Sequence, residues 1–233
     1  PKHDIYFQGK FSAKINTKNT VSRLLNILDK NKLINNQKFE IKIIKKIPQK
    51  SGMGGGSMNA ASLISYFLQK KILKIKKKEL ANIARLIGSD VILGIDPKNT
   101  VLSSSGKLTK FKKKLSYHLL ITKPNFGCTT RLIYSKVRNF SRARYNNPSL
   151  SLFNENNVIK SENALEKIAF KKYPKLRDLK SYLSKLPNLT FARMSGSGSS
   201  IVAYFNSKED VDIATKEFKK KFNSYWCITS KTI

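Results

Sequence analysis

A glycine-rich loop between a strand-like and a helix-like segment is the feature that most constrains this chain. Four of its 11 glycines lie between Gly52 and Gly56, where residues 48–61 read P-Q-K-S-G-M-G-G-G-S-M-N-A-A. Apolar and polar residues alternate over 39–47, which predicts a strand, and apolar residues recur at helical spacing over 60–68. Glycines let backbone N–H groups approach a ligand, and a helix N-terminus adds free donors and partial positive charge. This order therefore predicts a phosphate-binding loop.

Two widespread phosphate-loop motifs do not fit these residues. A Walker loop requires a lysine after its last glycine, whereas Ser57 follows Gly56. The dinucleotide fingerprint G-x-G-x-x-G is matched by Gly52 and Gly54 only, because Ser57 stands at the place of the third glycine. The alternative is a flexible loop without a ligand, but a linker would not be flanked by a strand pattern and a helix pattern.

Residues 48–61 resemble the P-x-x-x-G-L-G-G-G-S-S-N-A-A loop of the GHMP small-molecule kinases. Two further segments agree in the same order: I-G-S-D-V at 87–91 is similar to the family's L-G-A-D-V-P stretch, and R-M-S-G-S-G-S-S at 193–200 to its R-x-[ST]-G-[ST]-G-[SA] stretch. The resemblance implies an ATP-dependent small-molecule kinase. The S-x-N-A-A continuation is most similar to members that phosphorylate the 2-hydroxyl of 4-diphosphocytidyl-2-C-methyl-D-erythritol in the non-mevalonate isoprenoid pathway. Another GHMP kinase, of the homoserine or mevalonate type, is the alternative within the family.

The element pattern and the resemblance together indicate an α+β fold with two domains. Amphipathic helices are predicted over 20–33 and 77–87, and two strands are expected to pair around a turn at 103–106. From residue 117 the predicted order of strands and helices, with the last helix over 207–222, is that of a ferredoxin-like split βαβ unit. A lysine run at 112–114 places the boundary, giving domains of 1–114 and 115–233. The resemblance implies a ribosomal-protein-S5-like N-terminal domain, incomplete at its start, and a ferredoxin-like C-terminal domain.

The resemblance implies ATP-binding and catalytic roles in the first domain. Asn19 resembles the family's adenine contact and Lys45 a nucleotide-contacting lysine, although a helix cap and a solvated strand charge fit them equally well. Asp90 matches the catalytic aspartate, which would accept the hydroxyl proton during phosphoryl transfer from ATP with Mg²⁺ as cofactor. On the residues alone, a turn or cap aspartate is the preferred interpretation of Asp90. The phosphate-binding residues implied are Pro48, Gly52, Met53, Gly54, Gly55, Gly56, Ser57 and Asn59.

The second domain supplies the candidate substrate-binding residues. Thr130 and Tyr134 match the family's T-x-x-x-F segment, whose aromatic ring stacks on the cytosine. A half-buried helix tyrosine is the alternative for Tyr134, and a simple hairpin loop is the alternative for the second glycine-rich segment. The residues of that segment which would present donors to the substrate or the γ-phosphate are Gly196, Ser197, Gly198 and Ser199.

The net charge of +32, from 46 Lys and Arg against 14 Asp and Glu, would suit a nucleic-acid-binding module. The lysines are spread in short groups and accompany no nucleic-acid motif, so a solvated basic surface is the preferred interpretation. Two cysteines and two histidines cannot form a four-ligand zinc site without carboxylates. No apolar run reaches membrane-spanning length. We therefore expect a small-molecule substrate, no specific nucleic-acid or membrane partner, no metal site of the protein's own, a cytoplasmic location and a monomer or homodimer.

The start of the chain lacks two segments that the resemblance implies. The family's first strand, P-[AS]-K-[LI]-N-L, carries a lysine paired with the catalytic aspartate, and a G-Y-H segment binds the cytosine; neither occurs here. Lys10 and Lys14 lie in a segment that does not match that strand. Two departures, Met58 for Ser and Ile92 for Pro, are expected to affect the helix N-terminus and the turn that aims Asp90. We expect the printed chain to be incomplete at its start and to be inactive or a poor catalyst by itself.

Overall fold

The computed structural model describes residues 2–103, 107–111, 115–140, 148–149, 151 and 153–232. The chain forms two compact units: unit 1 comprises Pro1–Gln49 and Gly54–Pro97, and unit 2 comprises Lys50–Met53 and Lys98–Ile233. The domain boundary predicted between 114 and 115 borders residues 112–114, which lie outside the described residues, and it stays a prediction. The compact units divide earlier in the chain, between Pro97 and Lys98.

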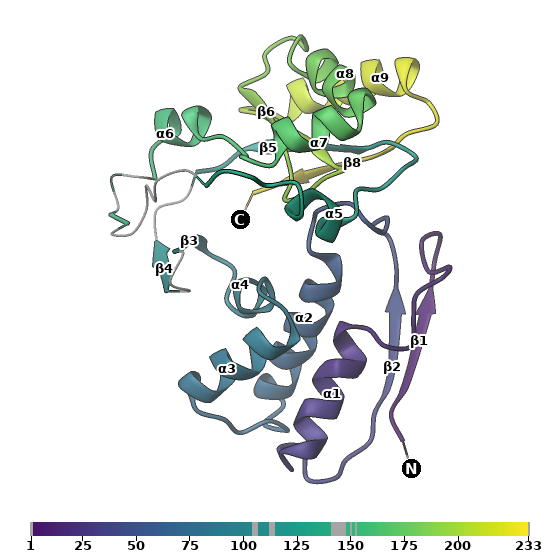
Figure 1. Ribbon diagram of the computed structural model, residues 1–233, viewed down its shortest axis with the longest axis vertical. Coiled ribbons are helices and arrows are strands. Elements are labelled where there is room, and N and C mark those ends of the chain that lie inside the picture. The colour runs from purple at the N-terminus through teal and green to yellow at the C-terminus, as the bar shows by residue number, and fades with distance from the viewer. Residues whose placement is uncertain are drawn as a thin grey trace. The chain divides into compact units, whose positions relative to one another are not determined.

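Unit 1 contains a parallel strand pair joined by a helix. Strands β1 (Asp4–Gln8) and β2 (Glu40–Ile44) pair in parallel, and helix α1 (Thr20–Lys30) forms the crossover that a parallel pair requires. Helices α2 (Gly55–Gln69), α3 (Lys77–Ile87) and α4 (Val91–Ile95) follow. Figure 1 shows α1 running beside the two strands. The strand predicted over 39–47 and the helices predicted over 20–33 and 77–87 are confirmed, whereas β1 and α4 were not predicted.

The core of unit 1 forms where the apolar faces of its helices meet. Leu24, Leu25 and Leu28 recur at helical spacing along α1, and Ile64 and Phe67 do so along α2; all five are fully buried. Burial of one such side chain contributes about 1.5–3 kcal/mol, so this cluster holds α1 and α2 together. The first turn of α2, which contains Gly55 and Gly56 of the glycine-rich loop, is thereby anchored to a packed core.

Unit 2 contains a four-stranded antiparallel sheet and a separate hairpin. Strands β3 (Asn99–Leu102) and β4 (Leu108–Phe111) pair as predicted, with turn residues 104–106 outside the described residues. Strands β5 (His118–Lys123), β6 (Phe191–Met194), β7 (Ile201–Phe205) and β8 (Trp226–Lys231) form the sheet in the order β6-β7-β5-β8. Strands β5 and β8, the first and last of the four in the sequence, are neighbours in the sheet, which is the ferredoxin-like arrangement predicted from the sequence.

The helices of unit 2 are α5 (Thr130–Tyr134), α6 (Glu155–Lys160), α7 (Glu166–Lys172), α8 (Pro174–Leu183) and α9 (Lys208–Lys221). Helix α8 packs on β6 and β7, and α9 packs on β5, β7 and β8, so that Leu179, Phe205 and Phe218 share one core. Ser207 caps α9, because its hydroxyl accepts a hydrogen bond from the Asp210 N–H at 3.0 Å.

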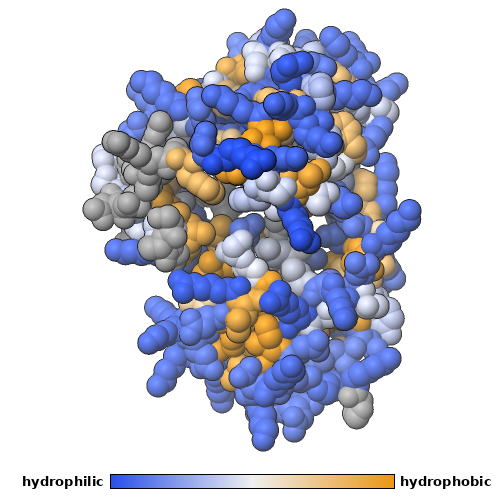
Figure 2. All heavy atoms as spheres, in the orientation of Figure 1, coloured by the Kyte–Doolittle hydropathy of each residue, from blue (hydrophilic) through white to orange (hydrophobic). Residues whose placement is uncertain are grey.

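The surface in view is mostly hydrophilic (Figure 2), as the charge composition predicts. Across the described ranges, no helix combines the length and the hydrophobicity that a membrane span needs. Cys128 and Cys227 are both free thiols.

Candidate active site

The glycine-rich loop places Gly54 at the N-cap of α2. Gly54 has a left-handed backbone with φ of 61°, and no side chain caps the helix. A residue with a Cβ would be strained in this conformation, which explains the glycine. The N–H groups of the first turn, from Gly55 to Ser57, consequently have no side-chain acceptor and can bind an anion.

Asp90 lies beside this helix N-terminus. A Cβ built on Gly54 would lie 3.6 Å from Asp90 Oδ2, and the Ser89 hydroxyl donates to Asp90 Oδ1 at 3.0 Å. Asp90 stands at the N-cap position of α4, but its side chain makes no capping hydrogen bond. Of the two alternatives for Asp90, the capping role is therefore wrong, whereas the turn is confirmed, because Asp90 lies in the turn between α3 and α4. Its carboxylate is exposed next to the predicted phosphate loop.

Lys45 directly follows β2, and its side chain reaches the same loop. A Cβ built on Gly55 would lie 3.7 Å from Lys45 Nζ. Desolvation by burial lowers the pKa of Lys45, so this ammonium is not a fully solvated strand charge. The structure thus brings together a cation, a carboxylate and free backbone donors within unit 1.

Asn19 has the capping role that the sequence left open. Its side-chain oxygen accepts hydrogen bonds from the N–H groups of Val21 and Ser22, and its amide group donates to the carbonyls of Asn16 and Thr17. The neighbouring Thr20 hydroxyl donates to the Gly56 carbonyl at 2.7 Å, which ties the start of α1 to the loop. A contact of Asn19 with adenine stays a prediction.

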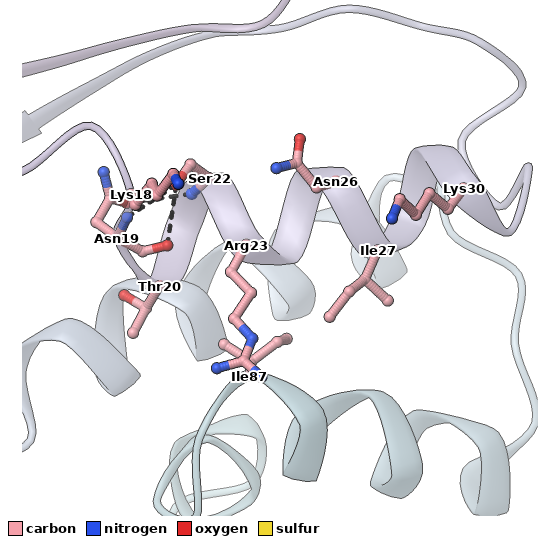
Figure 3. A pocket seen from close by; sticks show the side chains of 9 residues that line it. All are labelled: Lys18, Asn19, Thr20, Ser22, Arg23, Asn26, Ile27, Lys30 and Ile87. Atoms are coloured by element: carbon pink, nitrogen blue, oxygen red, sulfur yellow. Dashed lines mark hydrogen bonds between the residues drawn. The ribbon is translucent and has the colours of Figure 1, made fainter.

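A pocket of about 620 Å³ lies along α1 and reaches the end of α3 (Figure 3). Three cationic side chains and no carboxylate line it, which suits an anionic or polar ligand. In Figure 3, Arg23 extends from α1 toward the end of α3, whereas Asn26 points away from α3. The lining residues are Lys18, Asn19, Thr20, Ser22, Arg23, Asn26, Ile27, Lys30 and Ile87.

Met58 packs against α4. A Cβ built on Gly94 would lie 2.7 Å from Met58 Sδ, so the Met58 side chain fills the space that glycine leaves. Ser57, by contrast, keeps its hydroxyl near Gly88, where a built Cβ would lie 3.6 Å from Ser57 Oγ. The departure of Met58 from the family pattern therefore concerns packing between α2 and α4.

The first part of the predicted phosphate loop packs on the second glycine-rich segment within unit 2. The Ser195 hydroxyl donates to the Gly52 carbonyl at 3.0 Å, and the Ser200 N–H donates to the Ser51 carbonyl at 3.0 Å. Gly52 has φ of 73°, and a Cβ there would lie 2.2 Å from the Ser195 carbonyl oxygen. Residues 195–200 connect the antiparallel strands β6 and β7, so the segment is a hairpin connection. A ligand-binding role for it is compatible with this geometry and stays a prediction.

The substrate-binding candidates Thr130 and Ser197 are in contact. Thr130 Oγ1 and Ser197 Oγ lie 2.9 Å apart, which joins α5 to the second glycine-rich segment, residues 193–200. Tyr134 is 59% exposed, so the alternative of a half-buried helix tyrosine is wrong. Its ring is free to stack on a ligand.

Two residues that the sequence analysis missed fasten the loop. The Asn163 amide group donates to the carbonyls of Met194 and Gly196 at 2.8 and 2.7 Å, and Glu166 Oε1 accepts from the Met194 N–H at 2.7 Å. Glu166 is in turn paired with Lys180. These contacts join residues about 30 positions apart in the sequence, with a separation of 33 between Asn163 and Gly196. No local motif therefore predicts them.

Comparison with known proteins identifies the family. The chain matches the model of the GHMP kinases N terminal domain over residues 19–98 and that of the GHMP kinases C terminal region over 143–224. It is 56% identical over 232 residues to the 4-diphosphocytidyl-2-C-methyl-D-erythritol kinase of Pelagibacter ubique (strain HTCC1062), covering 100% of this chain and 83% of that protein. The protein of the same name from Petrotoga mobilis (strain DSM 10674 / SJ95) is 30% identical over 198 residues, covering 81% of this chain and 76% of that protein.

Solved structures show the same fold. The crystal structure of a 4-(cytidine 5'-diphospho)-2C-methyl-D-erythritol kinase superposes with a TM-score of 0.75 at 22% identity, covering 100% of this chain and 84% of that chain. A homoserine kinase from Cytophaga hutchinsonii ATCC 33406 superposes with a TM-score of 0.71 at 18% identity, covering 99% and 81%. Together with the sequence identities, these findings show that the chain belongs to the GHMP kinases and, within them, to the family of 4-diphosphocytidyl-2-C-methyl-D-erythritol kinases.

Proposed function

We propose that this protein transfers the γ-phosphoryl group of ATP to the 2-hydroxyl of 4-diphosphocytidyl-2-C-methyl-D-erythritol. The relatives that share up to 56% of its sequence carry that substrate in their names. The observation that carries the proposal is the position of the Asp90 carboxylate beside Gly54, at the uncapped N-terminus of α2. The proposed phosphate site and the proposed proton acceptor are thereby adjacent within one unit.

Phosphoryl transfer needs the phosphates held and the hydroxyl proton removed. The N–H groups of Gly55, Gly56 and Ser57, with the Lys45 ammonium, would bind the ATP phosphates. The substrate oxygen forms a bond to the γ-phosphorus as the bond to the departing ADP oxygen breaks, and its proton passes to Asp90. A positioned general base of this kind typically contributes about 10²–10⁴-fold to the rate.

The residues around Gly54 could bind Mg²⁺ only together with the phosphates of ATP. Among the described residues, no three His, Cys, Asp or Glu side chains are close enough to hold a metal ion by themselves. Mg²⁺ is usually held by substrate phosphates, water and one or two protein oxygens. Asp90 and Ser57 are the side chains that could supply those oxygens, and the ion when bound would neutralise charge on the phosphates.

The cytidyl half of the substrate would lie on unit 2 residues. We propose that the exposed ring of Tyr134 stacks on the cytosine and that Thr130 and residues 196–198 bind the polar part of the substrate. Ser199 was also a candidate, but it is fully buried and its hydroxyl donates to the Phe126 carbonyl, so it supports this segment from within unit 2. Exposure of Tyr134 and the contact between Thr130 and Ser197 support these roles. The cytoplasmic location, the monomeric or homodimeric state and the lack of specific nucleic-acid or membrane partners remain predictions from the sequence.

The test is ADP release by the complete gene product with three alcohols: the cytidyl erythritol substrate, homoserine and mevalonate. We expect turnover with the first alone. Release with homoserine or mevalonate instead would favour another GHMP kinase, and salt-sensitive RNA or DNA binding without any ADP release would favour a nucleic-acid-binding protein.

Substitution at Asp90 tests the proposed base. Asp90→Asn should lower kcat by about 10²–10⁴-fold, because the amide cannot accept the proton. Asp178→Asn is the matched control, since Asp178 is an exposed aspartate on α8. An Asp90→Asn protein with wild-type kcat would refute the assignment.

A further inference from the structure

Polar burial in the described residues is concentrated at one place in unit 2. The buried polar residues in these ranges are Ser51, Thr122, Lys123, Ser197, Ser199 and Ser200. All six belong to the loop 50–53, to the end of β5 or to the second glycine-rich segment, whose residues 195–200 precede β7. Buried polar groups are costly unless they are hydrogen-bonded, so such a concentration marks a polar network with a specific purpose.

Lys123 is the charged member of this network and is 5% exposed. Its Nζ donates to the Pro124 carbonyl at 2.9 Å and to the Phe126 carbonyl at 2.8 Å. Across the described parts of the chain, no carboxylate lies within ion-pair distance of it. Desolvation by burial lowers the pKa of Lys123. The two carbonyl oxygens are thus its main stabilising partners, and they belong to the turn that follows β5.

The Phe126 carbonyl links Lys123 to the second glycine-rich segment, in the loop 195–200. The Ser199 hydroxyl donates to the same carbonyl oxygen at 2.8 Å. Ser199 is fully buried, and its N–H donates to the Lys50 carbonyl at 3.4 Å. Lys123, the Phe126 carbonyl and Ser199 therefore form one continuous chain of hydrogen bonds into the loop.

The turn after β5 also leads directly to the substrate-binding candidates. Thr130 follows it by a few residues and contacts Ser197 of the loop. A side chain that fixes the Phe126 carbonyl therefore fixes both sides of the contact between Thr130 and Ser197. An apolar residue at a buried position is often as stabilising as a buried charge, so stability alone does not account for a lysine here.

We propose that Lys123 is a positioning residue for phosphoryl transfer, which holds the glycine-rich loop 195–200 in its substrate-binding form through the Phe126 carbonyl. This inference rests on the proposed function, in which that loop and Thr130 bind the alcohol substrate. It assigns Lys123 no contact with the reacting atoms. Small displacements of a positioning group can cost about 10²-fold in rate, so the effect is measurable.

The experiment compares Lys123→Met with Lys171→Met, since Lys171 is an exposed lysine on α7. For Lys123→Met we expect kcat/KM for the cytidyl erythritol substrate to fall about 10–100-fold, while the KM for ATP stays within about twofold. The melting temperature should change by only a few degrees, because methionine fills the same space without a charge. Lys171→Met should match the wild type in all three measurements.

A double-mutant cycle separates positioning from a general structural effect. Ser199→Ala removes the other donor to the Phe126 carbonyl, so the double variant should lose less activity than the product of the two single losses. Wild-type kcat/KM in Lys123→Met, or losses that multiply independently, would overturn the inference. Should Lys123→Met fail to fold, Ser199→Ala decides alone: an unchanged kcat/KM would overturn the inference. Failure of the proposed function would be seen separately, as no turnover by the wild type.

Discussion

Replacement of Gly52 by alanine should destabilise unit 2 more than the matched change at Gly54 destabilises unit 1. Both glycines have left-handed backbones, with φ of 73° and 61°, so each substitution carries about 1–2 kcal/mol of conformational strain. Their surroundings differ. The new Cβ would lie 2.2 Å from the Ser195 carbonyl oxygen in Gly52→Ala, but 3.6 Å from Asp90 Oδ2 in Gly54→Ala. Overpacking of this kind adds about 1–3 kcal/mol, giving about 2–5 kcal/mol for Gly52→Ala.

Urea unfolding followed by tryptophan fluorescence and by circular dichroism checks this difference. The chain has one tryptophan, Trp226 on β8, so its fluorescence reports on unit 2, whereas circular dichroism follows the helices of both units. Gly52→Ala should move the fluorescence transition to lower urea, and Gly54→Ala should leave that transition in place. Equal losses of unfolding free energy in the two variants would show that the close contact between Gly52 and Ser195 is not what requires glycine.

Three further predictions follow from contacts in the two units. Tyr134→Ala should raise the KM for the cytidyl substrate about 10–100-fold, because base stacking contributes about 1–3 kcal/mol, and Tyr134→Phe should restore it. Gly94→Ala should lower the free energy of unfolding by about 1–3 kcal/mol, because its Cβ would lie 2.7 Å from Met58 Sδ, and adding Met58→Ser should recover part of that loss in urea unfolding. A hydrogen bond from Lys38 holds the pKa of Asp29 below its ordinary value of 3.8, so this stabilisation is complete above that pH and is lost as the pH falls through the lowered pKa. Acid unfolding of Asp29→Asn should accordingly depend less on pH in that range, and equal pH profiles would exclude the contribution.

Local patterns predicted the elements whose burial repeats along the chain. Helix α3 has the predicted bounds, because its apolar residues recur at the period of a helix. The phosphate loop was predicted for the same reason, since a strand, a glycine cluster and a helix N-terminus are consecutive in the sequence. Asp90 needed the family resemblance, because nothing local distinguishes a base from a turn aspartate.

Features that depend on distant partners were missed. Strand β1 is five residues long, and its stability depends on pairing with β2, which begins at Glu40. Helix α6 buries no residue and therefore has no hydrophobic period to detect. Asn163 and Lys123 act on backbone carbonyls, and a side chain that binds a carbonyl leaves no signature in the sequence around it.

The glycine-rich loop also shows why one motif can hide two structural requirements. Residues Lys50–Met53 belong to unit 2, whereas Gly54 begins the helix of unit 1. Gly52 is required because backbone atoms of Ser195 and Gly198 occupy the space of a side chain, and Gly54 is required because the chain turns there with a positive φ next to Asp90. From the sequence motif, both glycines were predicted to bind phosphate. Of the two, Gly54 is the one that lies at a helix N-terminus, where the residues after it present free N–H groups. Of the two glycines, Gly54 is therefore the one whose substitution should weaken ATP binding directly, and Gly52 should act through the conformation of the loop 195–200.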